Sequence, residues 1–216
     1  MLPTTHRSPA KFRERLRLAT RVAHERLEVH VNLEGLAGSL ESYRSVLEQL
    51  LCIYRPIEAS LAKLDLAELG ICYEARRKVS WLEEDLKDLG HTADSLERLP
   101  AVRDFPVPKN CQEALGMLYV LEGSSLGGQL ILRKLAPVLN IGPLWAGRFY
   151  HGYGKNTGAM WQSFVAVLNA AGDAPDAAAR IEAAALATFA AFEKHLAQGH
   201  CPFVPSATDE SSGVRQ

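Results

Sequence analysis

The sequence lacks several features that would have assigned it to a class at once. It has no run of about 18 apolar residues that could span a bilayer, and its first residues, MLPTTHRSPAKF, lack the apolar core of a signal peptide. Its four cysteines form no C-x-x-C pair, which excludes the usual zinc and redox dithiol signatures, so we expect reduced thiols. The net charge of −1 provides no broad basic surface for nucleic acid. We therefore expect a cytoplasmic protein that binds neither nucleic acid nor membranes.

Apolar residues recur at helical spacing, and no strand-like alternation of useful length is present, so we expect an all-α fold, an irregular multi-helix bundle. A chain of 216 residues suits one domain, which we place at 9–198, and the polar residues 199–216 predict a flexible tail. Ser8 and Pro9 resemble a helix start, and Pro56 should kink or split the second helix. The expected helices cover about 9–31, 40–64, 74–89, 110–139, 160–168 and 177–197.

The helix expected after Asn110 contains three glycines within six residues, Gly123, Gly127 and Gly128. Each glycine inside a helix costs roughly 1 kcal/mol relative to alanine, so their presence requires a reason. One reading is a turn between two helices. The other is that Gly123 and Gly127, four residues apart on one face, let a planar ligand or another helix approach the backbone. The glycines alone leave both readings open.

His24 lies beside the apolar stripe of the first helix, where its ring could reach the interior and act as a ligand. Glu28 follows one turn later and could accept the ring N–H that an iron-bound imidazole leaves free. Arg17 precedes His24 by two turns and could meet an anionic group on the same ligand. The alternative is a structural histidine with a solvated Glu28 and Arg17.

Glycine and aromatic residues are dense in the segment NIGPLWAGRFYHGYGKNTG, residues 140–158, which indicates a structured loop. Four of its residues could form the rim of a binding site or be ordinary turn and surface residues: Arg148, Tyr150, Tyr153 and Lys155.

The segments LATRVAHERLE and LYVLEGSSLGGQ, read together, resemble the haem oxygenase family. The resemblance covers the chain from about Phe12 to Leu196. In that family the first helix supplies the proximal iron ligand and a glycine-containing helix crosses the opposite haem face, which implies His24 for the metal and Gly123, Gly127 and Gly128 for the distal wall. The run EGSSLGG, followed by FYHGYGKNTGAMWQSF, is most similar to the bacterial branch that supplies biliverdin to bacteriophytochromes.

The resemblance implies an enzyme that cleaves haem, its substrate and cofactor, to biliverdin, CO and Fe²⁺ with O₂ and an external reductant. It also implies Glu28 beside the ligand, and Arg17, Tyr153 and Lys155 as candidates for anchoring the haem propionates. No G-x-G-x-x-G motif follows a strand pattern, so the electrons must come from a separate reductase or ferredoxin. The product would serve as chromophore for a bacteriophytochrome, or the reaction would recover iron.

One position departs from the family pattern. Many members carry an aspartate directly after the first distal glycine, where it orders water, and this chain has Ser124. A serine is a weak general acid, so either Ser124 organises the water differently or turnover is impaired. The departure motivates an alternative, a haem-binding carrier or sensor without turnover. Two further alternatives are a helical enzyme of the same superfamily acting on thiamin-related compounds, and a haem-free helix bundle.

Overall fold

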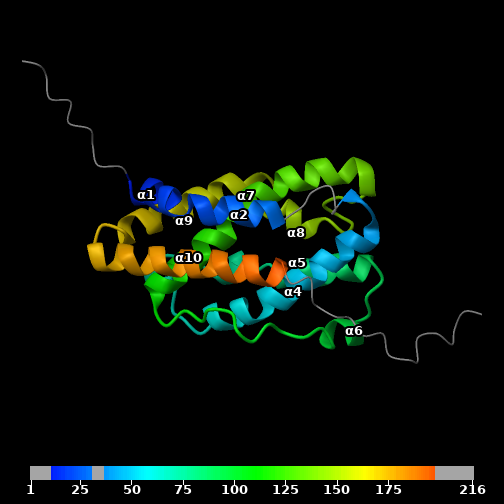
Figure 1. Cartoon of the computed structure of the whole chain (residues 1–216), viewed down its shortest axis with the longest axis horizontal. Helices are drawn as coiled ribbons and strands as arrows, with labels where there is room; N and C mark the ends of the chain where they lie inside the picture. The colour runs from blue at the N-terminus through cyan, green and yellow to red at the C-terminus, as the bar shows by residue number, and fades with distance from the viewer. Residues whose placement is uncertain (1–10, 31–36, 198–216) are drawn as a thin grey trace, which may run out of the picture.

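The computed structural model describes residues 11–30 and 37–197, and within these residues the chain is all-α, as expected (Figure 1). The expected helix start at Ser8 and Pro9 and the tail at 199–216 lie outside the described residues. The α-helices are α1 (Phe12–Ala19), α2 (Arg21–His30), α4 (Leu40–Leu61), α5 (Val79–Asp88), α6 (Ala93–Glu97), α7 (Cys111–Leu139), α8 (Arg148–His151), α9 (Thr157–Ala171) and α10 (Pro175–Ala197). Short 3₁₀ turns are η1 (Ala67–Leu69), η2 (Glu74–Arg76) and η3 (Gly154–Asn156).

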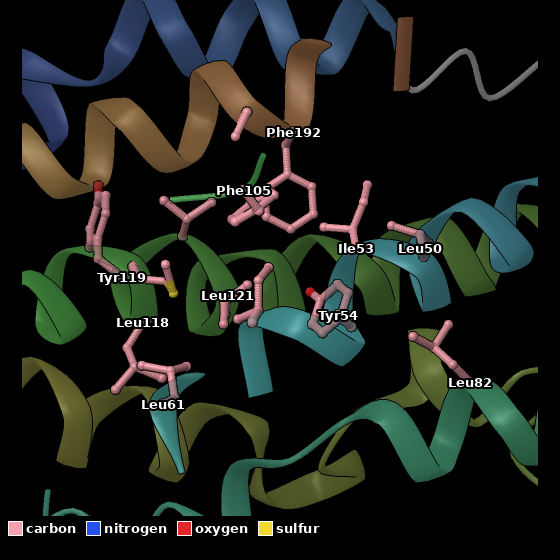
Figure 2. Close-up of a cluster of buried hydrophobic side chains, with 14 of the residues drawn as sticks. Leu50, Ile53, Tyr54, Leu61, Leu82, Phe105, Leu118, Tyr119, Leu121 and Phe192 are labelled. Carbon is pink, nitrogen blue, oxygen red and sulfur yellow. The ribbon is translucent and has the colours of Figure 1, made fainter. Parts of the chain in front are cut away.

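The two longest helices, α7 and α10, pack against each other and form the centre of the bundle. Gly116 permits their close approach, because a Cβ there would lie 2.2 Å from the carbonyl oxygen of Ile181. In Figure 1, α10 lies between the α1/α2 pair and α4, and it contacts all three. Figure 2 shows Phe192 of α10, Tyr54 of α4 and Leu121 of α7 in one buried cluster.

The glycine-rich stretch of α7 remains helical throughout, so the reading as a turn between two helices is wrong. Asn110 starts the helix as expected, because its side chain accepts a hydrogen bond of 2.9 Å from the backbone N–H of Glu113. Burial of the apolar residues of α7 offsets the helical cost of its glycines. Among the described helices α7 alone is long and apolar enough to cross a membrane, and 56% of its most apolar window is buried in the protein, as in a core helix.

The first expected helix is divided at Thr20 into α1 and α2. The Thr20 hydroxyl donates a 2.8 Å hydrogen bond to the carbonyl of Leu16, which also accepts the Thr20 backbone N–H. Such a side chain competes with the helical bonding pattern. The division leaves Arg17 on α1 and His24 on α2.

Pro56 does not split α4, contrary to one expectation. Proline has no N–H to donate to the carbonyl of Cys52 four residues earlier, and that carbonyl instead accepts the backbone N–H of Val102 at 3.1 Å.

The expectation of reduced thiols is wrong for Cys52, which is disulfide-bonded, whereas Cys72 and Cys111 are free.

Candidate functional site

A cavity of about 110 Å³ lies between α2, α4, α7, α8 and α10. Most of its lining is apolar, with a few hydroxyl groups and a single charged side chain, as in many small-molecule sites. Its lining residues are Leu27, Leu50, Tyr54, Lys78, Val120, Ser124, Ser125, Gly128, Ile131, Phe149, Tyr150, Phe192 and Leu196. The cavity therefore brings together the helix that carries His24, the glycine-rich part of α7 and the loop after residue 140.

His24 does not reach the interior as expected and is not among the residues that line this cavity; it is an exposed residue of α2, one helical turn before the lining residue Leu27. Its side chain is 58% exposed, and its ring packs edge-to-face on Phe189, with ring centres 5.8 Å apart. Leu27 lies one helical turn after His24, and Phe192 lies one helical turn after Phe189. Both Leu27 and Phe192 line the cavity. Nδ1 of His24 lies 3.5 Å from Oε1 of Glu28, so the two residues come together as expected. This arrangement leaves Nε2 as the nitrogen for a ligand.

Within residues 11–30 and 37–197, no group of three or more His, Cys, Asp or Glu side chains could hold a metal ion. A single imidazole beside a cavity suits a metal whose other coordination positions are already filled, as iron is in a porphyrin. The mainly apolar lining also suits the faces of such a macrocycle. The donor set and the cavity chemistry therefore fit haem.

The α7 wall contains Ser124, whose hydroxyl lies near that of Tyr54, and three glycines that differ in the space around them. Ser124 donates a 2.8 Å hydrogen bond to the carbonyl of Leu121, and its Oγ lies 3.4 Å from the Tyr54 hydroxyl. A Cβ on Gly128 would lie 3.1 Å from the carbonyl oxygen of Tyr150, so this glycine serves packing.

The other two glycines have more room around them. At Gly127 a Cβ would have nothing within 4 Å, and at Gly123 it would only reach the ring of Trp161 at 4.0 Å. Sequence reasoning singled out Gly123 and Gly127 as the pair that a ligand could approach and included Gly128 in the same wall. In the structure Gly128 packs against Tyr150, and space remains beside Gly123 and Gly127.

A buried charge cluster adjoins the cavity, formed by Arg76, Lys78, Glu122 and Tyr153. Glu122 is 1% exposed; its carboxylate accepts from Arg76 at 2.6 Å, from Lys78 at 2.8 Å and from the Tyr153 hydroxyl at 2.8 Å. Burial lowers the pKa of Lys78, while the charge and hydrogen bonds of Glu122 oppose that shift. Burial, together with Glu122, raises the pKa of Tyr153.

Sequence reasoning did not single out Arg76 or Lys78, which fall within the helix expected over residues 74–89. In the structure Glu58 holds the chain out of a helix there, since its carboxylate accepts the backbone N–H groups of Lys78 and Val79. Its other oxygen accepts from Arg77 Nε at 3.1 Å. The helix α5 consequently begins at Val79, and a signal that could have indicated this is the buried glutamate in the apolar stripe of α4.

The remaining predicted rim residues are dispersed. Arg148 forms ion pairs with Asp85 and Asp88 and so is not directed at the cavity. The Tyr153 hydroxyl belongs to the charge cluster. Arg17 on α1 and Lys155 on η3 are exposed and do not line the cavity.

Comparison with known proteins gives a consistent result. Residues 10–198 match the family model described as "Heme oxygenase". A heme oxygenase of Xanthomonas campestris pv. campestris (strain 8004) is 33% identical over 161 residues, which cover 73% of this chain and 90% of the relative. Heme oxygenase PigA of Pseudomonas aeruginosa is 28% identical over 156 residues, covering 72% of this chain and 76% of PigA.

Two solved structures share the fold. A heme oxygenase from Neisseria meningitidis, solved with NO and CO bound, has a TM-score of 0.69 at 23% identity and covers 96% of this chain and 100% of that one. Heme oxygenase 2 from Chlamydomonas reinhardtii, solved without heme, has a TM-score of 0.67 at 15% identity and covers 89% of this chain and 99% of that one.

Proposed function

This chain belongs to the haem oxygenase family of haem-degrading oxidoreductases, and we propose that it cleaves haem to biliverdin, CO and Fe²⁺ with O₂ and electrons from a separate reductase or ferredoxin. The observation that carries the proposal is a cavity with an apolar lining and a wall of small α7 residues, whose α2 side carries the accessible imidazole of His24 one helical turn before the lining residue Leu27. Haem, when bound, supplies the oxygen chemistry, and the protein supplies placement.

In this proposal His24 would hold the iron through Nε2, and Glu28 would accept the Nδ1 hydrogen and so fix the ring orientation. The cavity volume of about 110 Å³ is below the roughly 300 Å³ at which ligand pockets begin, so haem binding would require the cavity to widen. Of the described lining, α2 contributes only Leu27.

The glycine-rich part of α7 would hold the face of haem away from His24. The space beside Gly123 and Gly127 would allow the macrocycle to approach the backbone, and the Ser124 hydroxyl would hold water in the cavity. Arg17 and Lys155 are exposed and supply the cations for the propionates. The Tyr153 hydroxyl is engaged inside the charge cluster, so Tyr153 contributes to haem binding through that cluster rather than by direct contact.

We further propose that the biliverdin serves a bacteriophytochrome. Support comes from the runs EGSSLGG and FYHGYGKNTGAMWQSF, which are similar to the branch of the family with that role. Chromatography of the bilin against isomer standards, followed by transfer to a bacteriophytochrome apoprotein, tests the assignment. A product that no bacteriophytochrome accepts would instead favour iron recovery.

The primary test is aerobic incubation of the purified protein with haem and a reductant. Loss of the haem absorbance with the appearance of a bilin spectrum and of CO supports the enzyme. Because Ser124 stands where many relatives carry an aspartate, the competing function is a haem carrier or sensor. A haem complex whose spectrum stays unchanged under these conditions would establish the carrier.

A further inference from the structure

Lys78 is the charged residue among the residues that line the cavity, and it cannot swing away. It is 3% exposed, and its ammonium donates to Glu122 at 2.8 Å, to the Arg76 carbonyl at 3.1 Å and to the Tyr153 hydroxyl at 3.1 Å. These three acceptors use all three of its N–H donors. Lys78 therefore acts on a ligand through its charge rather than through a donated hydrogen bond.

The buried charges around Lys78 balance in number. Arg76 and Lys78 carry two positive charges, and Glu122 and Glu58 carry two negative charges. Glu58 also pairs with Arg77, whose side chain is 44% exposed. Of the four buried groups only Lys78 is among the residues that line the cavity, so a ligand there meets its positive charge at closer range than the two carboxylates.

We propose that Lys78 makes this cavity stabilise negative charge on a ligand bound at the haem iron, with Glu122 and Tyr153 as the residues that position its ammonium. The proposal rests on the proposed function, in which haem occupies the cavity. Ser124 faces the same space but is neutral, and its hydrogen is given to the Leu121 carbonyl. Lys78 thereby supplies the electrostatic stabilisation that the serine lacks.

A haem propionate is a second possible source of negative charge near Lys78. Lys78 is buried, whereas the cations Arg17 and Lys155 are exposed and lie where a carboxylate can keep its water. We therefore assign the anion to the iron side.

The test compares an anionic with a neutral iron ligand in the ferric haem complexes of the wild type and Lys78→Met. Two unit charges roughly 10 Å apart at an effective dielectric constant near 20 interact strongly enough to change an affinity about tenfold. Azide should bind about tenfold more weakly to Lys78→Met, while neutral imidazole binds as in the wild type. The pKa of iron-bound water, followed by its absorbance change, should rise by about one unit. The variant should fold, because it leaves Arg76 and Glu122 as a balanced pair.

Two control variants preserve the charge. Lys78→Arg should keep azide affinity close to wild type, and Tyr153→Phe, which removes only a hydroxyl, should change it by about twofold at most. An equal loss of azide and imidazole affinity in Lys78→Met would mean a structural role and overturn the proposal, as would unchanged azide binding.

A third arm examines the propionate. If Lys78→Met weakens binding of haem but not of haem dimethyl ester, Lys78 recognises a carboxylate and the iron-side assignment is wrong. Failure of the proposed function looks different, since a wild-type protein that produces no spectral shift on haem titration would remove haem from the cavity altogether.

Discussion

The two walls of the cavity are built in opposite ways. On the α2 wall, His24 and Glu28 are 58% and 68% exposed and contact each other at 3.5 Å. On the α7 side, the side chains of Lys78 and of Glu122, which belongs to α7, are 4% and 1% exposed and form part of a connected cluster. The comparison indicates that the two walls have different roles. The accessible wall binds the ligand, and the buried wall determines the electrostatic environment of the bound ligand.

The energetic consequences of the two walls should differ accordingly. An exposed ion pair contributes about 0–1 kcal/mol to stability, whereas breaking a buried one typically costs about 3–5 kcal/mol. Substitutions on the α2 wall should therefore change ligand binding and leave the fold intact. Substitutions on the buried wall should change the free energy of unfolding.

The largest effect is expected for His24→Ala. Removal of the imidazole should abolish bilin formation and alter the haem absorption spectrum, because the described residues that line the cavity include no histidine, cysteine or methionine that could replace the iron ligand. The free energy of unfolding of the apoprotein should change by less than about 0.5 kcal/mol, measured by urea denaturation. Added imidazole should restore a wild-type-like spectrum. Normal turnover by His24→Ala would refute the ligand assignment and the contrast between the walls.

Glu122→Ala tests the opposite wall. It leaves Arg76 and Lys78 buried without their carboxylate, so the apoprotein should lose about 3–5 kcal/mol of stability in urea denaturation. Glu25→Ala provides the matched control, since Glu25 forms an exposed pair with Arg21 and its loss should cost less than about 1 kcal/mol. Similar losses of unfolding free energy in Glu122→Ala and Glu25→Ala would show that the buried cluster is no more important for stability than an exposed ion pair.

Gly127→Leu and Gly128→Ala separate ligand space from packing space on α7. The open surroundings of Gly127 predict a folded apoprotein, but the added side chain should lie in the way of the macrocycle and weaken haem binding by about 1–3 kcal/mol or shift the cleavage site. Gly128→Ala should instead destabilise the apoprotein, because its Cβ would press on the Tyr150 carbonyl. Haem titration and isomer analysis measure the first effect and urea denaturation the second. An unchanged product and affinity in Gly127→Leu would place haem elsewhere.

The smallest effect is expected for Glu28→Gln. Loss of the negative charge should weaken the orientation of His24 and reduce haem affinity by about tenfold, without a measurable change in unfolding. The proposed pairing predicts that Glu28→Asp, which retains the carboxylate, recovers part of this loss. Wild-type haem affinity in Glu28→Gln would show that the 3.5 Å contact has no role in ligand binding.

Local patterns were enough to predict much of the fold. Helical periodicity identified the positions of α4, α7, α9 and α10, and Asn110 identified the start of α7 through its capping side chain. The division at Thr20, the unsplit helix around Pro56 and the late start of α5 were missed. Each depends on a partner chosen in the folded chain: the Leu16 carbonyl, the Val102 N–H and the Glu58 carboxylate.

What the sequence determined by itself was the all-α class and, through the two segments around His24 and Gly123, the family. These features are local, because helix periodicity and short motifs are complete within a few turns of the chain. Only the tertiary structure decided that Arg76, Lys78, Glu122 and Tyr153 form one buried cluster beside the cavity. Their positions span 78 residues, and burying a charge is favourable only when distant segments bring its partner to it.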